Sequence, residues 1–316
     1  MSNRSRWFRL VWIAPALVVL LLIAVLAAIA IRSSPAGQNF LADYPGYTPL
    51  PADAPVGIPA WLGWQHFLNM FFLLFIVRTG WVIRQGVRPS AFWTRKNDGR
   101  LRTKNPPVRI GLPLWFHLAV DIFWVLNGVV FVVLLFATGQ WMRIVPTSWG
   151  VIPNAVSAGL QYLSLNWPTE HAWVNYNSLQ VLSYFATVFL AAPLALVTGI
   201  RIAPGFAARL RPLDRVFPTR IARTVHFVVM IYFVGFTVVH VTLVLATGAL
   251  ENLNVMYASS DDAGWTGFWI FAASLVVLAA AWIGARPAVL TAIAGRTGTV
   301  RVMGGPARPP QPKPNP

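Results

Sequence analysis

The chain has no cysteine and very little charge. Without cysteine among its 316 residues, it cannot form disulfide bridges, thiolate zinc sites, iron–sulfur clusters or thioether-attached haem. Any metal must therefore be held by histidine, carboxylate or thioether ligands. Charged residues make up only 11% of the chain, against about 25% in soluble domains. Hydrophobic residues make up 56%, and the mean hydropathy is +0.59. This composition indicates an integral membrane protein.

Six long apolar runs have about the twenty residues that a membrane-spanning helix needs. An alternative for the first run is a signal peptide, because three arginines precede it. Its uncharged stretch exceeds the roughly 7–15 residues of a signal hydrophobic region, which favours a retained helix. We therefore predict an all-α integral membrane protein with six spans, namely Leu10–Ile31, Trp61–Ile83, Pro113–Ala137, Leu179–Ile200, Ile221–Thr247 and Trp265–Gly284.

Basic residues are concentrated on one side of these spans. The segment Arg84–Arg109 holds eight basic residues and one acid, Arg201–Arg223 holds six and one, and the segment from Arg286 holds five and none. With the three N-terminal arginines, 22 of the 25 basic residues lie on this side. Because positive residues stay in the cytoplasm, we expect both termini to be cytoplasmic. The net charge of +16 then reflects topology, and nucleic-acid binding is not expected.

Four of the five histidines lie within the predicted spans. His66 and His240 lie near the outer ends of the second and fifth spans, whereas His117 and His226 lie near the inner ends of the third and fifth. A helix turns about 100° and rises about 1.5 Å per residue, so His226 and His240 share one face roughly 21 Å apart. The fifth, His171, is expected at the surface of an outer loop, with a partner or quinone site as the alternative.

Histidine is costly in hydrocarbon and marks function. Two depth-matched pairs are the ligand set of two six-coordinate b-type haems: an outer haem on His66 and His240, and an inner haem on His117 and His226. Ligation on both faces leaves no open site at the iron, which favours electron transfer over oxygen chemistry.

Glycines and charges within the spans have two interpretations each. Gly80, Gly128 and Gly235 would let a macrocycle approach the backbone, or they are ordinary helix contacts. Arg78 and Asp121 lie near the depth of the inner haem. They form an ion pair, or else Arg78 neutralises a haem propionate while Asp121 orients a ligand or relays a proton.

Three motifs carry a family resemblance: Gly-Trp-Gln-His at 63–66, Leu-Trp-Phe-His at 114–117, and two histidines at 226 and 240. The block 61–247 that holds them resembles the bacterial cytochrome b561 family. That family includes the di-haem cytochrome b subunits of membrane-bound nickel–iron hydrogenases and formate dehydrogenases. Its third core helix carries no ligand, and the fourth span of this chain has no histidine.

The resemblance implies two haems b and electron exchange between membrane quinone and an extracytoplasmic partner of the molybdenum oxidoreductase or hydrogenase type. Substrate chemistry would belong to that partner, so whether the chain is itself an enzyme is left open. It also implies the bacterial cytoplasmic membrane. The alternatives are a standalone quinone-linked oxidase, a membrane anchor whose haems only stabilise a complex, and a proton or metal transporter with histidines lining its pore.

The expected organisation has four parts. Residues 1–60 form an N-terminal span with an outer linker, and residues 61–248 form a four-helix haem-binding bundle. Residues 249–285 supply an outer loop and a sixth span, and residues 286–316 a cytoplasmic, proline-rich tail. The outer connection Gly139–Tyr176 is expected to contain one or two short helices on the outer surface. They are either a platform on which a partner docks or an ordinary interfacial loop.

Overall fold

The computed structural model describes residues 4–98, 102–104, 106–168, 172–207 and 211–303. Long helices dominate it, and six are long and apolar enough to cross a membrane: Val11–Ser33, Ala60–Arg84, Leu112–Ala137, Ser178–Ile202, Thr219–Ala246 and Thr266–Gly284. These confirm the predicted all-α, multi-pass membrane protein, with span limits within a few residues of those expected. Outside the spans, the chain forms short helices and one small sheet.

The chain divides into two compact units. Unit 1 comprises residues 1–60, 132–195 and 235–268, and unit 2 comprises 61–131, 196–234 and 269–316. The boundary cuts through several helices, because α4 (Leu112–Ala137), α7 (Ala192–Ile202), α9 (Thr219–Ala246) and α11 (Thr266–Gly284) contribute residues to both units.

In unit 1 the first span ends at a sharp corner. Helix α1 (Arg4–Ser33) is followed at once by α2 (Pro35–Asp43), with Ser34 between them. The Ser34 hydroxyl donates to the Ile31 carbonyl at 2.7 Å and accepts from the Gly37 amide at 3.1 Å. A Cβ on Gly37 would lie 1.9 Å from the Ile31 oxygen. The turn therefore depends on a hydroxyl cap and on a glycine that lets the two helices approach closely.

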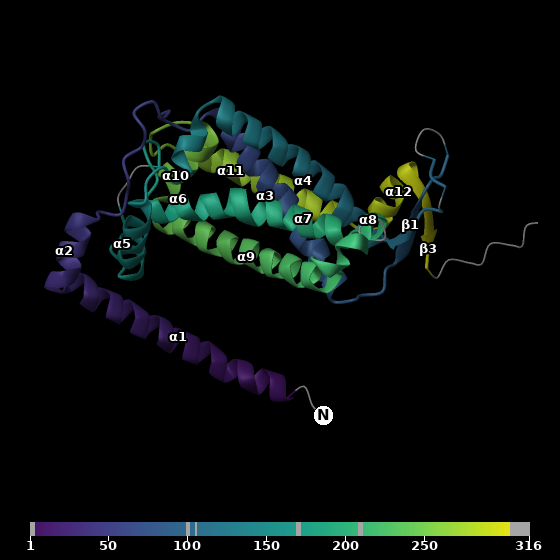
Figure 1. The fold of residues 1–316 in the computed structure, drawn as a ribbon, viewed down its shortest axis with the longest axis horizontal. Helices are drawn as coiled ribbons and strands as arrows, with labels where there is room; N and C mark the ends of the chain where they lie inside the picture. The colour runs from purple at the N-terminus through teal and green to yellow at the C-terminus, as the bar shows by residue number, and fades with distance from the viewer. Residues whose placement is uncertain (1–3, 99–101, 105, 169–171, 208–210, 304–316) are drawn as a thin grey trace, which may run out of the picture. The chain divides into compact units, whose positions relative to one another are not determined.

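The outer connection of unit 1 contains two short helices, as predicted: η2 (Gln140–Arg143) and α5 (Val151–Leu163). Helix α5 packs against α6 (Ser178–Phe185) and α1 (Figure 1). A capping box between Asn177 and Gln180 starts α6. The fourth span then continues through the π-helical segment η3 (Ala186–Ala191) into α7.

A buried arginine joins the loops of unit 1. Arg143 is 1% exposed, and its guanidinium donates to the carbonyls of Gly57, at 2.7 Å, and Ala172. It also lies over the Tyr176 ring, with 5.0 Å from Cζ to the centroid. Burial lowers the pKa of Arg143 and raises the pKa of the Tyr176 phenol, although the nearby guanidinium partly offsets the latter. These contacts hold the segment before α3 against two parts of the outer connection.

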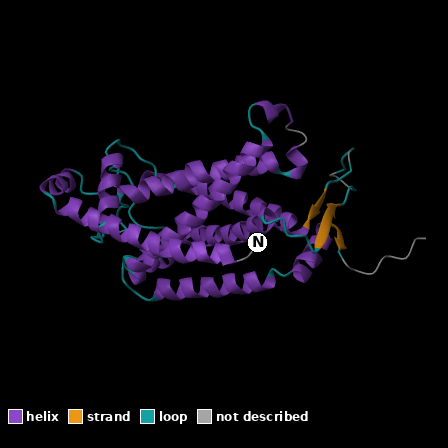
Figure 2. Ribbon diagram, turned by 90° about the horizontal axis from the view of Figure 1, so that it is seen from below, coloured by secondary structure: helices purple, strands orange, loops and turns teal. Residues whose placement is uncertain are grey.

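Unit 2 contains α3 (Ala60–Arg84) and the small antiparallel sheet, orange in Figure 2. Its strand order is β2–β1–β3, with Trp93 of the central strand opposite Ile110 and Val300. The Trp93 indole donates to the Ala294 carbonyl at 3.2 Å. The elements here are β1 (Ala91–Arg95), β2 (Arg109–Gly111), α12 (Pro287–Thr297) and β3 (Gly298–Val302).

Regular structure therefore extends into the segment 286–316, which we expected to be a tail. Its part from 304 onward lies outside the described residues. The remaining elements are short: α8 (Pro204–Ala207), η4 (Arg211–Arg215), α10 (Ala249–Leu253) and the π-helical η5 (Asn254–Ala258).

Candidate functional site

Two of the predicted ligands lie side by side in unit 2. His117, in the second turn of α4, and His226, in the third turn of α9, have ring centroids 6.4 Å apart and ring planes inclined at 73°. The His117 side chain is buried, with 8% of its residue surface exposed. The structure thus brings together the pair that the sequence assigns to the inner haem.

A threonine on α3 orients the ring of His117. The Thr79 hydroxyl lies 2.8 Å from Nδ1 of His117 and 2.7 Å from the Phe75 carbonyl oxygen. Since the carbonyl can only accept, the hydroxyl proton is donated to Phe75, and the hydroxyl oxygen accepts from Nδ1–H of the imidazole. A neutral imidazole that carries its proton on Nδ1 keeps a lone pair on Nε2. Thr79 therefore favours the tautomer that can bind a metal through Nε2.

His226 has an equivalent partner on the fourth span. Its Nδ1 lies 2.9 Å from the hydroxyl of Thr198, a fully buried residue of α7. The span that carries no histidine therefore still contributes to the site, by positioning the ring of His226.

Each of these threonines is followed by a glycine on which a histidine ring rests. A Cβ on Gly80 would lie 3.5 Å from Cε1 of His117, and a Cβ on Gly199 would lie 3.4 Å from Cε1 of His226. The Thr-Gly dipeptides 79–80 and 198–199 thus form two similar cradles. The prediction from sequence named neither threonine nor Gly199. Thr-Gly dipeptides also occur at 138–139, 247–248, 266–267 and 297–298, so the dipeptide alone does not mark these two positions.

The geometry of the pair fits axial ligation of one iron. Two metal–nitrogen bonds of about 2 Å, added to the ring radii, place imidazole centroids roughly 6 Å apart when they flank one ion. The observed separation is 6.4 Å. In the described part of the chain, no group of three or more histidine or acidic residues could hold a bare ion. Two imidazoles suit an iron whose other four ligands come from a porphyrin.

Asp121 and Arg78, the two charged residues near this pair, make no contact with each other in the part of the chain that the structure describes. Asp121 lies one turn beyond His117, with 3.7 Å between its Oδ2 and the imidazole Nε2. Arg78 donates instead to the carbonyls of Trp282, at 3.1 Å, and Ala285, at 3.4 Å. Its Cζ also lies 4.1 Å from the Trp282 ring centroid. Arg78 therefore caps the C-terminal end of α11, which disfavours the ion-pair interpretation, while its role at a haem propionate stays a prediction.

The other predicted pair falls in different units. His240 belongs to unit 1, where its ring stacks on Phe236 with 5.5 Å between centroids and meets the Tyr184 ring edge-on at 6.2 Å. His66 is a half-buried residue of α3 in unit 2. Their pairing stays a prediction, and His171 lies outside the described residues. Tyr184 comes just before η3, and π-helical turns are frequent at functional sites.

Two glycines assigned to the haem sites have open space around them. A Cβ at Gly128 or Gly235 would meet no heavy atom within 4 Å. No protein contact requires glycine at these positions, and their role beside a macrocycle stays a prediction.

Comparison with known proteins adds no assignment to this site. No protein-family model matches the sequence, and no curated protein or solved structure matches the chain.

Proposed function

We propose that this protein is a di-haem membrane cytochrome b that carries electrons between an extracytoplasmic redox partner and the quinone pool. The observation that carries the proposal is the His117–His226 pair, whose rings have the separation of two ligands of one iron and whose Nδ1 atoms are both held by threonine hydroxyls. Haem supplies a reversible one-electron couple between ferrous and ferric iron.

The side chains around this haem would limit its chemistry to the transfer of one electron. Burial of the His117 ring limits the access of water to the site. The Thr79 hydroxyl accepts the Nδ1 proton of His117, and the Thr198 hydroxyl lies within hydrogen-bond distance of Nδ1 of His226. Both contacts orient the rings, so that the ligands themselves need not gain or lose protons when the electron arrives. With imidazole on both faces no coordination position remains open, which suits electron transfer better than the oxidase alternative.

A second haem on His66 and His240 would complete the pathway. Its support is the spacing along α9, where fourteen residues place His240 roughly 21 Å from His226 along the helix axis. Two centres at these depths divide the hydrocarbon core of about 30 Å into shorter steps. This proposal includes a partner of the molybdenum oxidoreductase or hydrogenase type and a place in the bacterial cytoplasmic membrane, both of which rest on the family resemblance. It also includes cytoplasmic termini, which rest on the 22 basic residues.

Haem content and spectra test the proposal. The pyridine haemochrome assay on purified protein should give two haems b per chain, both extractable by acid acetone. His117→Ala and His226→Ala should remove the same haem, and His66→Ala and His240→Ala the other, with His171→Ala as the control. A folded protein that binds no haem would refute the assignment, and loss of one common signal in His66→Ala and His117→Ala would refute the pairing.

One contact favours a second function. The 3.7 Å separation between His117 and Asp121 also suits a proton path through the membrane, in which both groups titrate. Proton flux into liposomes containing haem-free protein distinguishes the two functions. A proton flux that is abolished by Asp121→Asn would favour the transporter. The cytochrome is supported if these vesicles show no proton flux and if the same protein, when supplied with haem, binds two haems per chain.

A further inference from the structure

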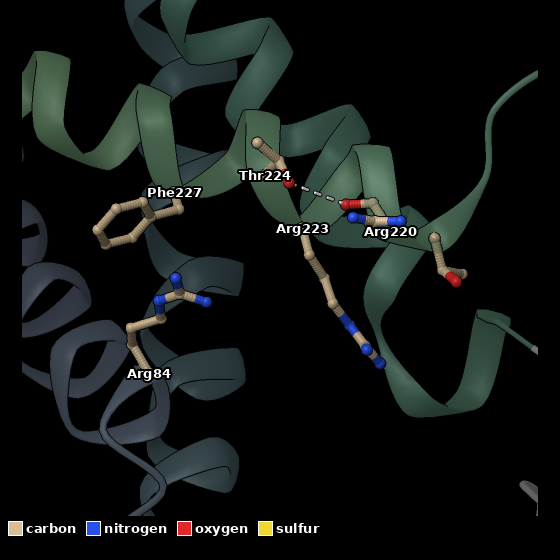
Figure 3. Close-up of a pocket in the computed structure, with 6 residues that line it drawn as sticks. Arg84, Arg220, Arg223, Thr224 and Phe227 are labelled. Atoms are coloured by element: carbon tan, nitrogen blue, oxygen red, sulfur yellow. Dashed lines mark hydrogen bonds between the residues drawn. The ribbon is translucent and has the colours of Figure 1, made fainter.

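A cavity of about 280 Å³ opens beside the ends of two spans in unit 2. It lies between Arg84, the last residue of α3, and the first turns of α9 (Figure 3). The residues that line it are three arginines, two threonines and one phenylalanine, namely Arg84, Arg220, Arg223, Thr219, Thr224 and Phe227.

The positive charge in this cavity has no acidic counterpart within the described chain. No described aspartate or glutamate forms a salt bridge with Arg84, Arg220 or Arg223. Asp214, the acid of the preceding segment, is paired with Arg201. Three arginines around one cavity give it a positive potential, so the cavity attracts an anion.

The lining matches a phosphate group in particular. Guanidinium groups bind phosphate oxygens through two parallel hydrogen bonds. The first turn of the long helix α9 adds free backbone N–H groups and the positive end of the helix dipole. The Cζ of Arg84 lies 4.7 Å from the centroid of the Phe227 ring, which holds this guanidinium against the cavity wall.

The position of the cavity favours a lipid over a soluble phosphate. It lies where the second span ends and the fifth begins, at the depth of lipid headgroups. On α9, Ile221 and Val228 are 50% and 58% exposed, and helical spacing puts both on one face, roughly 80–100° around the axis from Arg220. They offer an apolar track along which an acyl chain could lie below the headgroup.

From the unpaired arginines and this position, we propose that the cavity binds the phosphate group of an anionic phospholipid. The site is independent of the haems and adds a lipid ligand to the proposed electron-transfer function. Basic pockets between spans at the cytoplasmic side are suited to such headgroups.

Lipid titrations of the whole protein in detergent test this site. Native mass spectrometry should show that wild-type protein binds phosphatidylglycerol more tightly than phosphatidylcholine. Each arginine at a membrane surface changes the affinity for anionic lipid about fivefold. Arg84→Gln and Arg223→Gln should therefore each weaken phosphatidylglycerol binding about fivefold, and Arg84→Lys should weaken it less. Arg296→Gln, an exposed arginine of α12 outside the cavity, is the matched control and should bind as wild type does.

Inorganic phosphate distinguishes the two sources of the group. We expect millimolar phosphate to leave phosphatidylglycerol bound, because it gains nothing from the apolar surface of α9. Displacement of the lipid at that concentration would overturn the lipid assignment in favour of a soluble anion. Equal binding of the two lipids by wild type, or equal loss in Arg296→Gln and Arg223→Gln, would overturn the site itself. Circular dichroism confirms that each variant is folded.

Discussion

Replacing Thr79 by valine tests how the protein prepares the His117–His226 site. Valine keeps the branched shape of the side chain but removes the hydroxyl that accepts from Nδ1–H of His117 at 2.8 Å. Thr79 is buried, so water does not readily replace the hydroxyl. A buried donor without a partner costs about 1–3 kcal/mol. At 1.4 kcal/mol per factor of ten, haem binding at this site should weaken roughly 5- to 150-fold.

In the variant, the haem that still binds to His117 and His226 should also have a different redox potential. A hydrogen bond from Nδ1–H raises the basicity of the ligating imidazole, and a more basic ligand stabilises ferric iron. Without the Thr79 hydroxyl, the midpoint potential of this haem should rise, while that of the second haem stays constant. Haem titration of the depleted protein gives the affinity, and redox-poised optical spectra give the two potentials.

Thr138→Val is the matched control. The Thr138 hydroxyl bonds the carbonyl four residues earlier at 2.8 Å, as that of Thr79 does, but it is exposed at the end of α4 and no histidine ring is among its partners. The control should keep the haem affinity and both potentials of wild type. The orienting role of Thr79 would be refuted if Thr79→Val bound haem as tightly as this control, with unchanged potentials.

Three further predictions follow. Arg78→Gln should lower the midpoint potential of the haem on His117 and His226, because a nearby cation stabilises the reduced state; unchanged potentials with lower thermal stability would leave Arg78 only as the cap of α11. Above pH about 10, wild type should lose stability relative to Tyr176→Phe, by at most about 1.4 kcal/mol per pH unit. Burial raises the pKa of Tyr176, so the unfolded chain releases the phenol proton at a lower pH than the folded protein does. Thermal denaturation temperatures of the two proteins that change in parallel from pH 8 to 11 would contradict this. A C-terminal reporter should be active only in the cytoplasm, and activity outside it would reverse the topology.

The spans and one histidine pair could be predicted from sequence for a simple physical reason. Hydrocarbon demands long apolar helices, and those runs are visible in one dimension. Once the helices and their orientation are set, depth follows from residue number, which is why His117 and His226 could be matched although they are far apart in the chain.

The partners of those histidines could not be predicted in the same way. A threonine in a span usually bonds the carbonyl of its own preceding turn, as Thr242 does, so Thr79 and Thr198 do not stand out from the others. Only rotation of the helices about their axes decides which threonine faces a histidine, and packing between side chains sets that rotation.

The small sheet was missed for a related reason. Strands β1, β2 and β3 have three to five residues each, too short for a clear alternating pattern. The pairing of β1 with β3 joins segments about 200 positions apart in sequence, with Trp93 opposite Val300. Such contacts depend on how the spans return the chain to the same end.

The two Thr-Gly cradles bear on how the protein is made. Thr79 and His117 belong to consecutive spans, and so do Thr198 and His226. Each helical hairpin can therefore orient its own imidazole as it leaves the insertion machinery, before the other hairpin arrives. Under the proposed function, a haem bound by His117 and His226 would enter last and would link the two hairpins. When haem is scarce during biogenesis, the two hairpins should be correctly inserted but loosely associated. Proteases could then cleave the chain where the hairpins would otherwise pack together.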